Sequence, residues 1–400
     1  MKTLKHLFNS IKAKQQLTII GIILLTVNPG CSQSISDNAD DNCVYITDGI
    51  GNDGTISVKA ETVVDGLEVP WGIAFLPNGD MLVTERPGRI RMVKNYAENP
   101  ELIKQPVATI STANTSEGGL LGIAIHPDFI SNRLFYIYVT VDQGNDTYNQ
   151  VEQWRLAKDG TTAEQVKVIF DNIQASRNHN GGRVAFGPDN MLYVGTGDAS
   201  SPSLSQDPES PNGKLLRITP DGEIPEDNPI SGNPMYLMGI RNTQGWAWPD
   251  PDDASELWFT DHGPSGERMR FGHDEMSIAR AGDNLGWPDI YRCETKNGMI
   301  TPSIVWKDAA PPGGAAIYTG DAIPEWKGSF LIGTLGSSHL QRIVIENQKV
   351  TTNEVYFKDD FGRIREVIQG PDGHLYITTS NCDGRGNCQT QKDVILRISK

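Results

Sequence analysis

The chain has 400 residues, of which 50 are acidic and 35 are basic, so its formal net charge at pH 7 is −15. This charge argues against a nucleic-acid binder or a protein that binds anionic membranes, because both need a basic surface. The 41 glycines and 24 prolines would interrupt long helices and argue against a helical bundle. The length allows one large all-β domain or two ordinary domains.

Residues 1–30 have the pattern of an export signal. Several lysines precede an apolar run from Leu17 to Val27, which is shorter than the roughly 20 residues of a membrane-spanning helix. Cys31 follows a glycine, as at a lipoprotein cleavage site, although Asn28 stands where such sites usually carry leucine. We expect an exported, periplasmic or cell-surface protein. Acylation of Cys31 and an uncleaved N-terminal anchor both remain open.

Residues 31–60 are expected to form a tether and N-terminal segment, followed by the main domain at 61–400. The first part of this segment, from Ser32 to Asn42, is polar and acidic, so it has little apolar surface to bury.

Four cysteines beyond Cys31 allow three disulfide pairings in an oxidising compartment. Cys382 and Cys388 flank a short turn-forming loop and are expected to pair, which leaves Cys43 with Cys293. A metal site is the alternative, but no histidine stands at ligand spacing among these cysteines.

One pattern recurs six times: an apolar alternating run, a turn with proline, and a second apolar run. The copies lie at 71–83, 121–128, 183–194, 245–259, 316–332 and 366–377. Alternation predicts strands with a buried face, and Pro-Asp-Gly predicts a tight turn, so each copy is expected to be a hairpin. A further strand is expected after each hairpin, at 90–93, 151–156, 215–218, 276–278, 341–345 and 394–398.

The turn prolines stand 47 to 75 residues apart, which suits blades of about 40–50 residues plus loops. Six such units predict an all-β fold, a six-bladed β-propeller with four-stranded blades. An open β-sandwich or barrel with unrelated hairpins is the alternative.

Propeller ligands bind on loops at one end of the central channel, so polar residues beside the repeats are candidate site residues. His179 lies among amides and glycines just before a predicted strand, where core packing explains it poorly. Its ordinary pKa of about 6.5 suits proton abstraction at neutral pH. Asp198, at the end of the same hairpin, is placed to orient this base or to stabilise its charge.

Three further segments carry candidate ligand-binding groups. Glu117 precedes two glycines, which allow a ligand to approach the backbone closely. The alternative is that the two glycines only form a bend that leads into a strand. Arg241 and Asn242 offer a guanidinium fork and an amide to a planar, oxygen-rich ligand, unless the arginine pairs with a carboxylate. Arg363 and Arg365 point to the same side of a strand and would clamp carboxylates, unless both are surface arginines.

The segment 260–266, followed by Asp274 and Glu275, offers turn carbonyls and carboxylates, which are donors that Ca²⁺ prefers. A solvated acidic turn is the alternative. His262 and His273 are weak zinc candidates, because no third nitrogen or sulfur ligand is evident. The sequence has no Gly-x-Ser-x-Gly elbow, phosphate-binding loop or Rossmann fingerprint, which disfavours serine hydrolases, nucleotide hydrolases and NAD enzymes.

In their common order these segments resemble the soluble quinoprotein glucose/sorbosone dehydrogenase family, which includes the aldose sugar dehydrogenases. The likeness runs from about Val63 to Ile398 and is strongest at 117–129, 178–183, 241–245, 262–264, 274–275, 284–288 and 363–365. The resemblance implies a six-bladed propeller that uses pyrroloquinoline quinone (PQQ) and Ca²⁺ to oxidise the C1 hydroxyl of an aldose to the lactone.

The resemblance also implies roles for single residues. His179 corresponds to the general base for the C1 hydroxyl, from whose carbon hydride passes to the quinone C5, and Asp198 to an acidic residue nearby. Arg241 and Asn242 correspond to residues near the quinone oxygens, where Arg241 would stabilise a developing oxyanion.

Arg363 and Arg365 correspond to a clamp for the cofactor carboxylates. Calcium ligands are implied at four positions, the carbonyls of Gly263 and Pro264 beside the quinone, and Glu275 with the Leu285 carbonyl at a further site. Calcium beside the quinone would polarise its carbonyl as a Lewis acid.

The sequence departs from the family pattern in three places. Glu117 replaces a glutamine in the cofactor site and adds a negative charge. Gly336 replaces a cofactor-binding lysine. The loss of this positive charge should weaken cofactor binding unless Lys327 or Arg385 takes its place. Residues 267–273 are an insertion between the implied calcium ligands.

We therefore expect a sugar dehydrogenase with a small-molecule sugar substrate, no nucleic-acid partner, and membrane contact only through an N-terminal lipid anchor. The electron acceptor, the sugar and the oligomeric state do not follow from the sequence. Two alternatives stay open: a non-catalytic propeller that has lost PQQ, and a calcium-dependent lactonase-type propeller.

Overall fold

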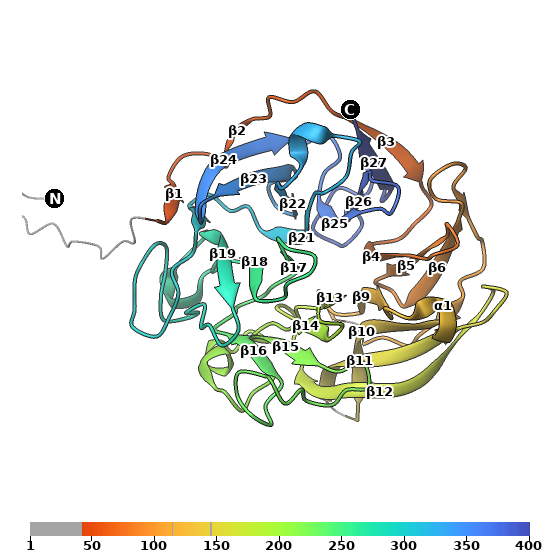
Figure 1. Ribbon diagram of the computed structural model, residues 1–400, viewed down its shortest axis with the longest axis horizontal. Helices are drawn as coiled ribbons and strands as arrows, with labels where there is room; N and C mark the ends of the chain where they lie inside the picture. The colour runs from red at the N-terminus through yellow and green to blue at the C-terminus, as the bar shows by residue number, and fades with distance from the viewer. Residues whose placement is uncertain (1–41, 114, 145) are drawn as a thin grey trace, which may run out of the picture. The chain divides into compact units, whose positions relative to one another are not determined.

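The computed structural model describes residues 42–113, 115–144 and 146–400. The expected export signal, Cys31 and the first part of the tether lie outside these residues. The described chain folds into six sheets arranged around a common axis as a six-bladed β-propeller (Figure 1). The predicted fold class and blade number are confirmed, and the sandwich or barrel alternative is wrong. No helix in this part of the chain is long and apolar enough to cross a membrane.

Blades 1 to 3 follow one another along the chain, and each starts with the strand nearest the axis (Figure 1). Blade 1 contains β4 (Pro70–Phe75), β5 (Met81–Glu85), β6 (Arg89–Lys94), β7 (Glu101–Leu102) and β8 (Ala108–Thr109), which also pairs with β6. Blade 2 contains β9 (Leu120–Ile125), α1 (Phe129–Asn132), β10 (Leu134–Gln143), β11 (Asp146–Leu156) and β12 (Ala163–Gln174). Blade 3 contains β13 (Val184–Phe186), β14 (Leu192–Gly195), the 3₁₀ turn η1 (Pro202–Gln206), β15 (Lys214–Ile218) and β16 (Met235–Met238).

Blades 4 to 6 continue the same order. Blade 4 contains β17 (Gly245–Ala247), β18 (Glu256–Asp261), the 3₁₀ turn η2 (Glu267–Met269), β19 (Asp274–Arg280) and β20 (Ile304–Trp306). Blade 5 contains β21 (Pro312–Ile317), the 3₁₀ turn η3 (Pro324–Trp326), β22 (Phe330–Thr334), β23 (Leu340–Glu346) and β24 (Lys349–Tyr356). Blade 6 contains β25 (Ile364–Gln369), β26 (Leu375–Thr379) and β27 (Ile395–Ser399). The six predicted hairpins and their third strands are all present within these elements.

Strands from the N-terminal segment complete three blades. β3 (Lys59–Val64) pairs antiparallel with β27 and is the fourth strand of blade 6. β1 (Val44–Ile46) and β2 (Asn52–Asp53) pair parallel with the outer strands of blades 4 and 5, which therefore have five strands each. Residues 44–64 are thus part of the propeller, although the sequence predicted no strands before residue 61.

Both expected disulfides are present. Cys43 is bonded to Cys293 and ties the start of β1 to blade 4. Cys382 is bonded to Cys388 and closes a short loop between β26 and β27. The alternative of a metal site at these cysteines is therefore wrong.

The cores of the molecule lie between neighbouring blades. Each of the six apolar clusters joins side chains of neighbouring blades; Leu82 of blade 1 and Phe135 of blade 2, for example, share one cluster. A central strand such as β5 is buried along its whole length, because both faces of its sheet have a neighbour. This packing fixes the first strand of each blade, and the loops that precede those strands carry the candidate site.

Candidate functional site

Loops between blades enclose a cavity of about 390 Å³, within the range of small-molecule sites. Five of the predicted residues line it together: His179, Arg241, Glu117, Arg363 and Arg365. Four of them come from loops before β9, β13, β17 and β25, and Arg365 lies at the start of β25, so they are far apart in the sequence. The propeller therefore gathers the predicted imidazole and guanidinium groups at one site.

His179 is held in one orientation by Asp198. Its Nδ1 lies 2.7 Å from Asp198 Oδ1, and the second carboxylate oxygen accepts a hydrogen bond from Trp287 Nε1 at 2.9 Å. A carboxylate accepts a hydrogen bond, so Nδ1 carries the proton and the Nε2 lone pair of the neutral imidazole is free to act as a base. Asp198 is fully buried and lies behind the histidine. Its position is the one expected for a group that orients the histidine.

The backbone around His179 is strained into its position. His179 has a φ of 60°, and Gly197 packs so closely that a Cβ there would meet the carbonyl oxygen of His179 at 2.0 Å. Asn242 is buried beside this loop, where its Oδ1 accepts a hydrogen bond from Gly181 N at 2.9 Å. Its side chain lies behind the cavity and supports the histidine loop.

Arg241 is buried and already holds a carboxylate. Its Nη2 lies 2.7 Å from Oε1 of Glu267, which is part of the inserted segment and lines the same cavity. The same Glu267 oxygen lies 3.9 Å from His179 Nε2. Although burial opposes it, Arg241 holds the pKa of Glu267 below its ordinary value, so this carboxylate is charged at neutral pH. The inserted segment thus places an anion between the predicted base and the predicted oxyanion-binding arginine.

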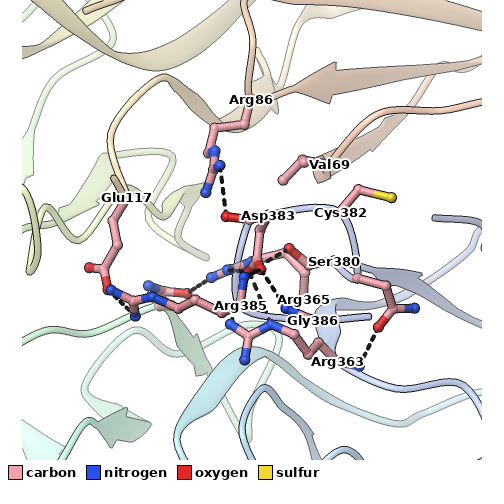
Figure 2. Close-up of polar contacts among 12 residues, drawn as sticks. Val69, Arg86, Glu117, Arg363, Arg365, Ser380, Cys382, Asp383, Arg385 and Gly386 are labelled. Atoms are coloured by element: carbon pink, nitrogen blue, oxygen red, sulfur yellow. Dashed lines mark hydrogen bonds and ion pairs between the residues drawn. The ribbon is translucent and has the colours of Figure 1, made fainter. Parts of the chain in front are cut away.

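A buried carboxylate, that of Asp383, organises the other arginines of the cavity (Figure 2). Asp383 Oδ2 accepts hydrogen bonds from Nε and Nη2 of Arg363 at 3.0 and 2.9 Å, and it lies 3.4 Å from Arg365 Nη2. Arg86 Nη2 donates to the carbonyl oxygen of Asp383 at 3.1 Å. Burial opposes ionisation of Asp383, but Arg365 and Arg363 hold its pKa below the ordinary value.

Arg365 is the most deeply buried of these arginines. Burial lowers its pKa to about 10, so it still carries its charge at neutral pH. Its Nη1 donates to Gln244 Oε1, whereas its buried Nε has no partner among the described residues. A buried donor without a partner costs free energy, which favours a ligand at this position.

Glu117 joins the two sides of the cavity. Its Oε2 accepts a hydrogen bond from the backbone N of His179 at 2.8 Å, and its Oε1 pairs with Arg385 Nη1 at 2.6 Å. Arg385 therefore lies in the cavity, as one of the two cations considered in place of the missing lysine at Gly336. The other, Lys327, pairs with Asp321 and is not part of the cavity lining.

A second, smaller cavity brings together the four predicted metal-binding residues. It has a volume of about 20 Å³, enough for one small ion or water. Its lining includes four predicted ligand positions, namely Gly263, Pro264, Glu275 and Leu285. The described residues contain no group of three His, Cys, Asp or Glu side chains spaced as metal ligands, so a cation here needs backbone carbonyl oxygens.

The carboxyl groups beside this small cavity are poorly compensated. Burial raises the pKa of Asp261 to about 7 and that of Asp274 to about 6. Burial, together with these two neighbours, also raises the pKa of Glu275. Buried carboxylates near backbone carbonyls form the donor set that Ca²⁺ prefers, and a divalent cation would relieve their repulsion.

The zinc candidates have other partners. His262 Nε2 donates to the Pro312 carbonyl at 2.6 Å, and His273 bonds the hydroxyls of Tyr45 and Tyr291 at 2.9 and 2.8 Å. Each of these two side chains is therefore accounted for by protein contacts.

The cavity lining also includes residues that were not singled out from the sequence as ligand-binding groups, among them Trp71, Arg86, Gln244 and Asp383. Trp71 starts one of the repeat copies, and Gln244 lies in the segment 241–245 that resembles the family. The position of these two residues at or beside a first strand could therefore have identified them. Arg86 and Asp383 carried no local signal, because only the closed propeller brings them together.

The glucose/sorbosone dehydrogenase family model matches residues 67–396. The chain is 32% identical over 351 residues to the aldose sugar dehydrogenase YliI of Escherichia coli (strain K12), covering 82% of this chain and 91% of that protein.

Two solved structures agree with this match. The PQQ-bound aldose sugar dehydrogenase of Streptomyces coelicolor is 35% identical, with a TM-score of 0.75 over 86% of this chain and 98% of that chain. The soluble aldose sugar dehydrogenase of Escherichia coli, in its apo-form, is 30% identical, with a TM-score of 0.75 over 86% of this chain and 99% of that chain. On the extent of these matches, this chain belongs to the glucose/sorbosone dehydrogenase family.

Proposed function

We propose that the protein oxidises the C1 hydroxyl of an aldose to the lactone, with PQQ as the electron-accepting cofactor and Ca²⁺ beside it. The observation that carries this proposal is the charge of the larger cavity. Its lining holds five arginines and three carboxylates, although the whole chain has a formal charge of −15. A surplus of guanidinium groups beside an oriented imidazole suits an oxygen-rich anion that takes part in proton and hydride transfer.

The residues present fit a planar ligand with several carboxylates. Arg363 and Arg365 approach the cavity side by side, and the unpartnered Nε of Arg365 is available to an acceptor. PQQ is such a ligand, and when bound it accepts the hydride that leaves the substrate carbon. Family membership and the PQQ-bound Streptomyces coelicolor relative support this assignment.

His179 would take the proton. Its Nε2 faces the cavity while Asp198 holds Nδ1, so the imidazole removes the proton of the C1 hydroxyl and becomes an imidazolium stabilised by the buried carboxylate. The substrate loses this proton and a hydride, which together carry away two electrons, and C1 becomes the lactone carbonyl. The imidazolium returns its proton to solvent before the next cycle.

Arg241 would stabilise negative charge that develops on an oxygen near His179. Its guanidinium is buried, and a buried donor interacts more strongly with such charge than one in water. Glu267 occupies this guanidinium in the ligand-free protein and must move away or share it when a ligand binds. The same contact favours the second candidate, a propeller that keeps the fold and binds PQQ too weakly for catalysis.

The sequence suggested two calcium sites, but all four positions line one small space, so we propose a single Ca²⁺ there, held by Glu275 and the carbonyls of Gly263, Pro264 and Leu285. Their placement around one small space supports this site. The cation would neutralise Glu275 and fix the loop that starts at Gly263. Since His262 lines both cavities, the metal would also steady one wall of the larger site.

Adding PQQ and Ca²⁺ to the ligand-free protein, and then measuring dye reduction with a panel of sugars, separates the candidates. A sugar dehydrogenase binds PQQ and reduces dye with at least one aldose. A non-catalytic propeller gives no turnover, and a lactonase hydrolyses lactones without PQQ. Lactone hydrolysis alone, or the absence of any PQQ binding, would contradict the proposal.

We also propose that the protein is exported, because two disulfides suit an oxidising compartment. Mass spectrometry of the mature N-terminus tests this and distinguishes acylated Cys31 from simple cleavage. A mature protein that starts at Met1 would overturn cleavage.

A further inference from the structure

The loop closed by the Cys382–Cys388 disulfide presents one arginine to the larger cavity (Figure 2). The side chain of Arg385 leaves this loop and reaches Glu117, with Nη1 2.6 Å from Oε1, while its Nη2 donates to Asn178 Oδ1 at 2.8 Å. Glu117 and Asn178 belong to the loops before β9 and β13, so this contact spans the cavity between distant blades. Arg385 is therefore a cation delivered across the site from blade 6.

The base of this loop is rigid. Asp383 Oδ1 accepts hydrogen bonds from the backbone N of Arg385 and Gly386 at 2.8 and 3.3 Å, and the disulfide closes the loop behind them. Gly386 packs tightly, because a Cβ there would lie 2.8 Å from Cδ of Arg363. The backbone that carries Arg385 is thus fixed against the arginine predicted to clamp a carboxylate.

The guanidinium at the end of this rigid base is free to change partners. The side chain of Arg385 is 49% exposed and that of Glu117 is 20% exposed. Ion pairs with this much solvent contact contribute little to stability, so Arg385 can exchange Glu117 for another carboxylate at low cost. By contrast, Arg363 and Arg365 share the buried carboxylate of Asp383.

We propose that Arg385 binds a carboxylate of the anionic ligand, leaving Glu117 when the ligand enters, and so supplies the cation that Gly336 lacks. This inference rests on the proposed function, because PQQ is the carboxylate ligand. Gly336 lies next to Leu335, which lines the cavity, and a Cβ added at Gly336 would meet Pro311 Cγ at 3.1 Å. This wall of the cavity therefore carries no lysine side chain, whereas Arg385 reaches the cavity from the disulfide-closed loop.

The first test is the dissociation constant of PQQ, measured by calorimetry in the presence of Ca²⁺. We expect Arg385→Ala to weaken binding about 10- to 100-fold and Arg385→Lys to recover part of that loss, as for a charge-assisted hydrogen bond. Arg280→Ala is the control, because Arg280 is an exposed arginine that pairs with Glu256 outside the cavity. Equal affinities of Arg385→Ala and the unmodified protein would overturn the inference.

Exchange of partners has a second signature. Glu117→Gln keeps an oxygen for the backbone N of His179 but removes the charge that competes for Arg385. We expect this single substitution to tighten PQQ binding several-fold, and by a smaller factor when Arg385→Ala is also present. Weaker binding by Glu117→Gln would show that the ion pair must persist, which contradicts exchange.

The disulfide is tested in the same way. Replacing both Cys382 and Cys388 by serine should weaken PQQ binding several-fold, and adding Arg385→Ala to this variant should then change little. If Arg385→Ala has its full effect in the variant without the disulfide, the disulfide does not help to place the arginine.

Arg365→Ala separates this inference from the proposed function. Loss of PQQ binding in Arg365→Ala but not in Arg385→Ala leaves the proposed function standing and overturns the inference alone. A protein that fails to bind PQQ with Ca²⁺ present overturns both.

Discussion

The two cavities lie next to each other and share His262, yet their charged groups differ in kind. The larger cavity is rich in arginine, whereas the smaller one is lined by the carboxyl groups of buried Asp261 and half-buried Glu275, with an exposed Arg292. Burial and then the charge of Arg241 hold the pKa of His262 well below its ordinary value, so the shared wall is neutral at pH 7. This difference in charge is the reason for proposing an anionic ligand in one cavity and a cation in the other.

The largest expected effect comes from the larger cavity. His179→Ala should lower kcat about 10²- to 10⁴-fold, the range for loss of a positioned base, while PQQ affinity changes little. Steady-state dye reduction and calorimetric titration measure the two quantities. His374→Ala, at the β25–β26 turn outside both cavities, is the control. Turnover within tenfold of the unmodified protein would show that another group removes the proton.

Asp383→Asn removes the carboxylate that Arg363 and Arg365 share. We expect the ligand-free protein to lose roughly 3–5 kcal/mol of unfolding free energy, because buried cations are left unpaired. Thermal unfolding with and without PQQ measures this loss, which should shrink when ligand carboxylates replace Asp383. A loss that is unchanged by PQQ would contradict the assignment of the arginines to the ligand.

The same carboxylate makes a pH-dependent contribution. The folded protein holds the pKa of Asp383 below its unfolded value, so its stabilisation is present above about pH 4 and is lost as the pH falls further. Asp383→Asn should therefore flatten the acid limb of a plot of unfolding temperature against pH. An acid limb as steep as that of the unmodified protein would show that other carboxylates dominate it.

The smaller cavity is tested by its affinity for Ca²⁺. Glu275→Gln should weaken Ca²⁺ binding about 10- to 100-fold, because it removes a charged ligand from a site otherwise built of carbonyl oxygens. Calorimetry on the PQQ-free protein measures this directly. Glu226→Gln, on an exposed loop, is the matched control. Unchanged Ca²⁺ affinity would place the cation elsewhere.

The smallest expected effect concerns Glu267, a negatively charged side chain in the arginine-rich larger cavity. Glu267→Gln should tighten PQQ binding by a factor of about three to ten, since the negative charge on Arg241 competes with an anionic ligand. The affinity can be measured by the ability of PQQ to displace a fluorescent probe from the protein. Weaker binding would indicate that Glu267 itself contacts the ligand or the sugar.

The fold was largely predictable because each blade carries its own local signal. A copy such as residues 71–83 contains both the alternation of its strands and the turn between them, and the structure places β4 and β5 there. The N-terminal strands were not predictable in this way. β1 and β2 have three and two residues, too few for alternation, and their partners lie far along the chain.

The site was predictable where a segment combined unusual chemistry with a position just before a strand. His179, Arg241 and Arg363 met this condition, and they line one cavity. Arg385 was named only as a substitute for a missing lysine, because its contact with Glu117 depends on the closure of the whole propeller. Glu267 was noted as part of an insertion, but its contact with Arg241 depends on the path of that insertion across the cavity.

Blade 6 has a consequence for how the protein is made. Its three inner strands are synthesised after the strands of the other five blades, whereas β3, its outer strand, is synthesised before β4 of blade 1. Until β27 has left the ribosome, β3 has no partner and the last blade stays open. A nascent chain can assemble its earlier blades in turn, but the arginines of blade 6 join the cavity only after β27 has been made.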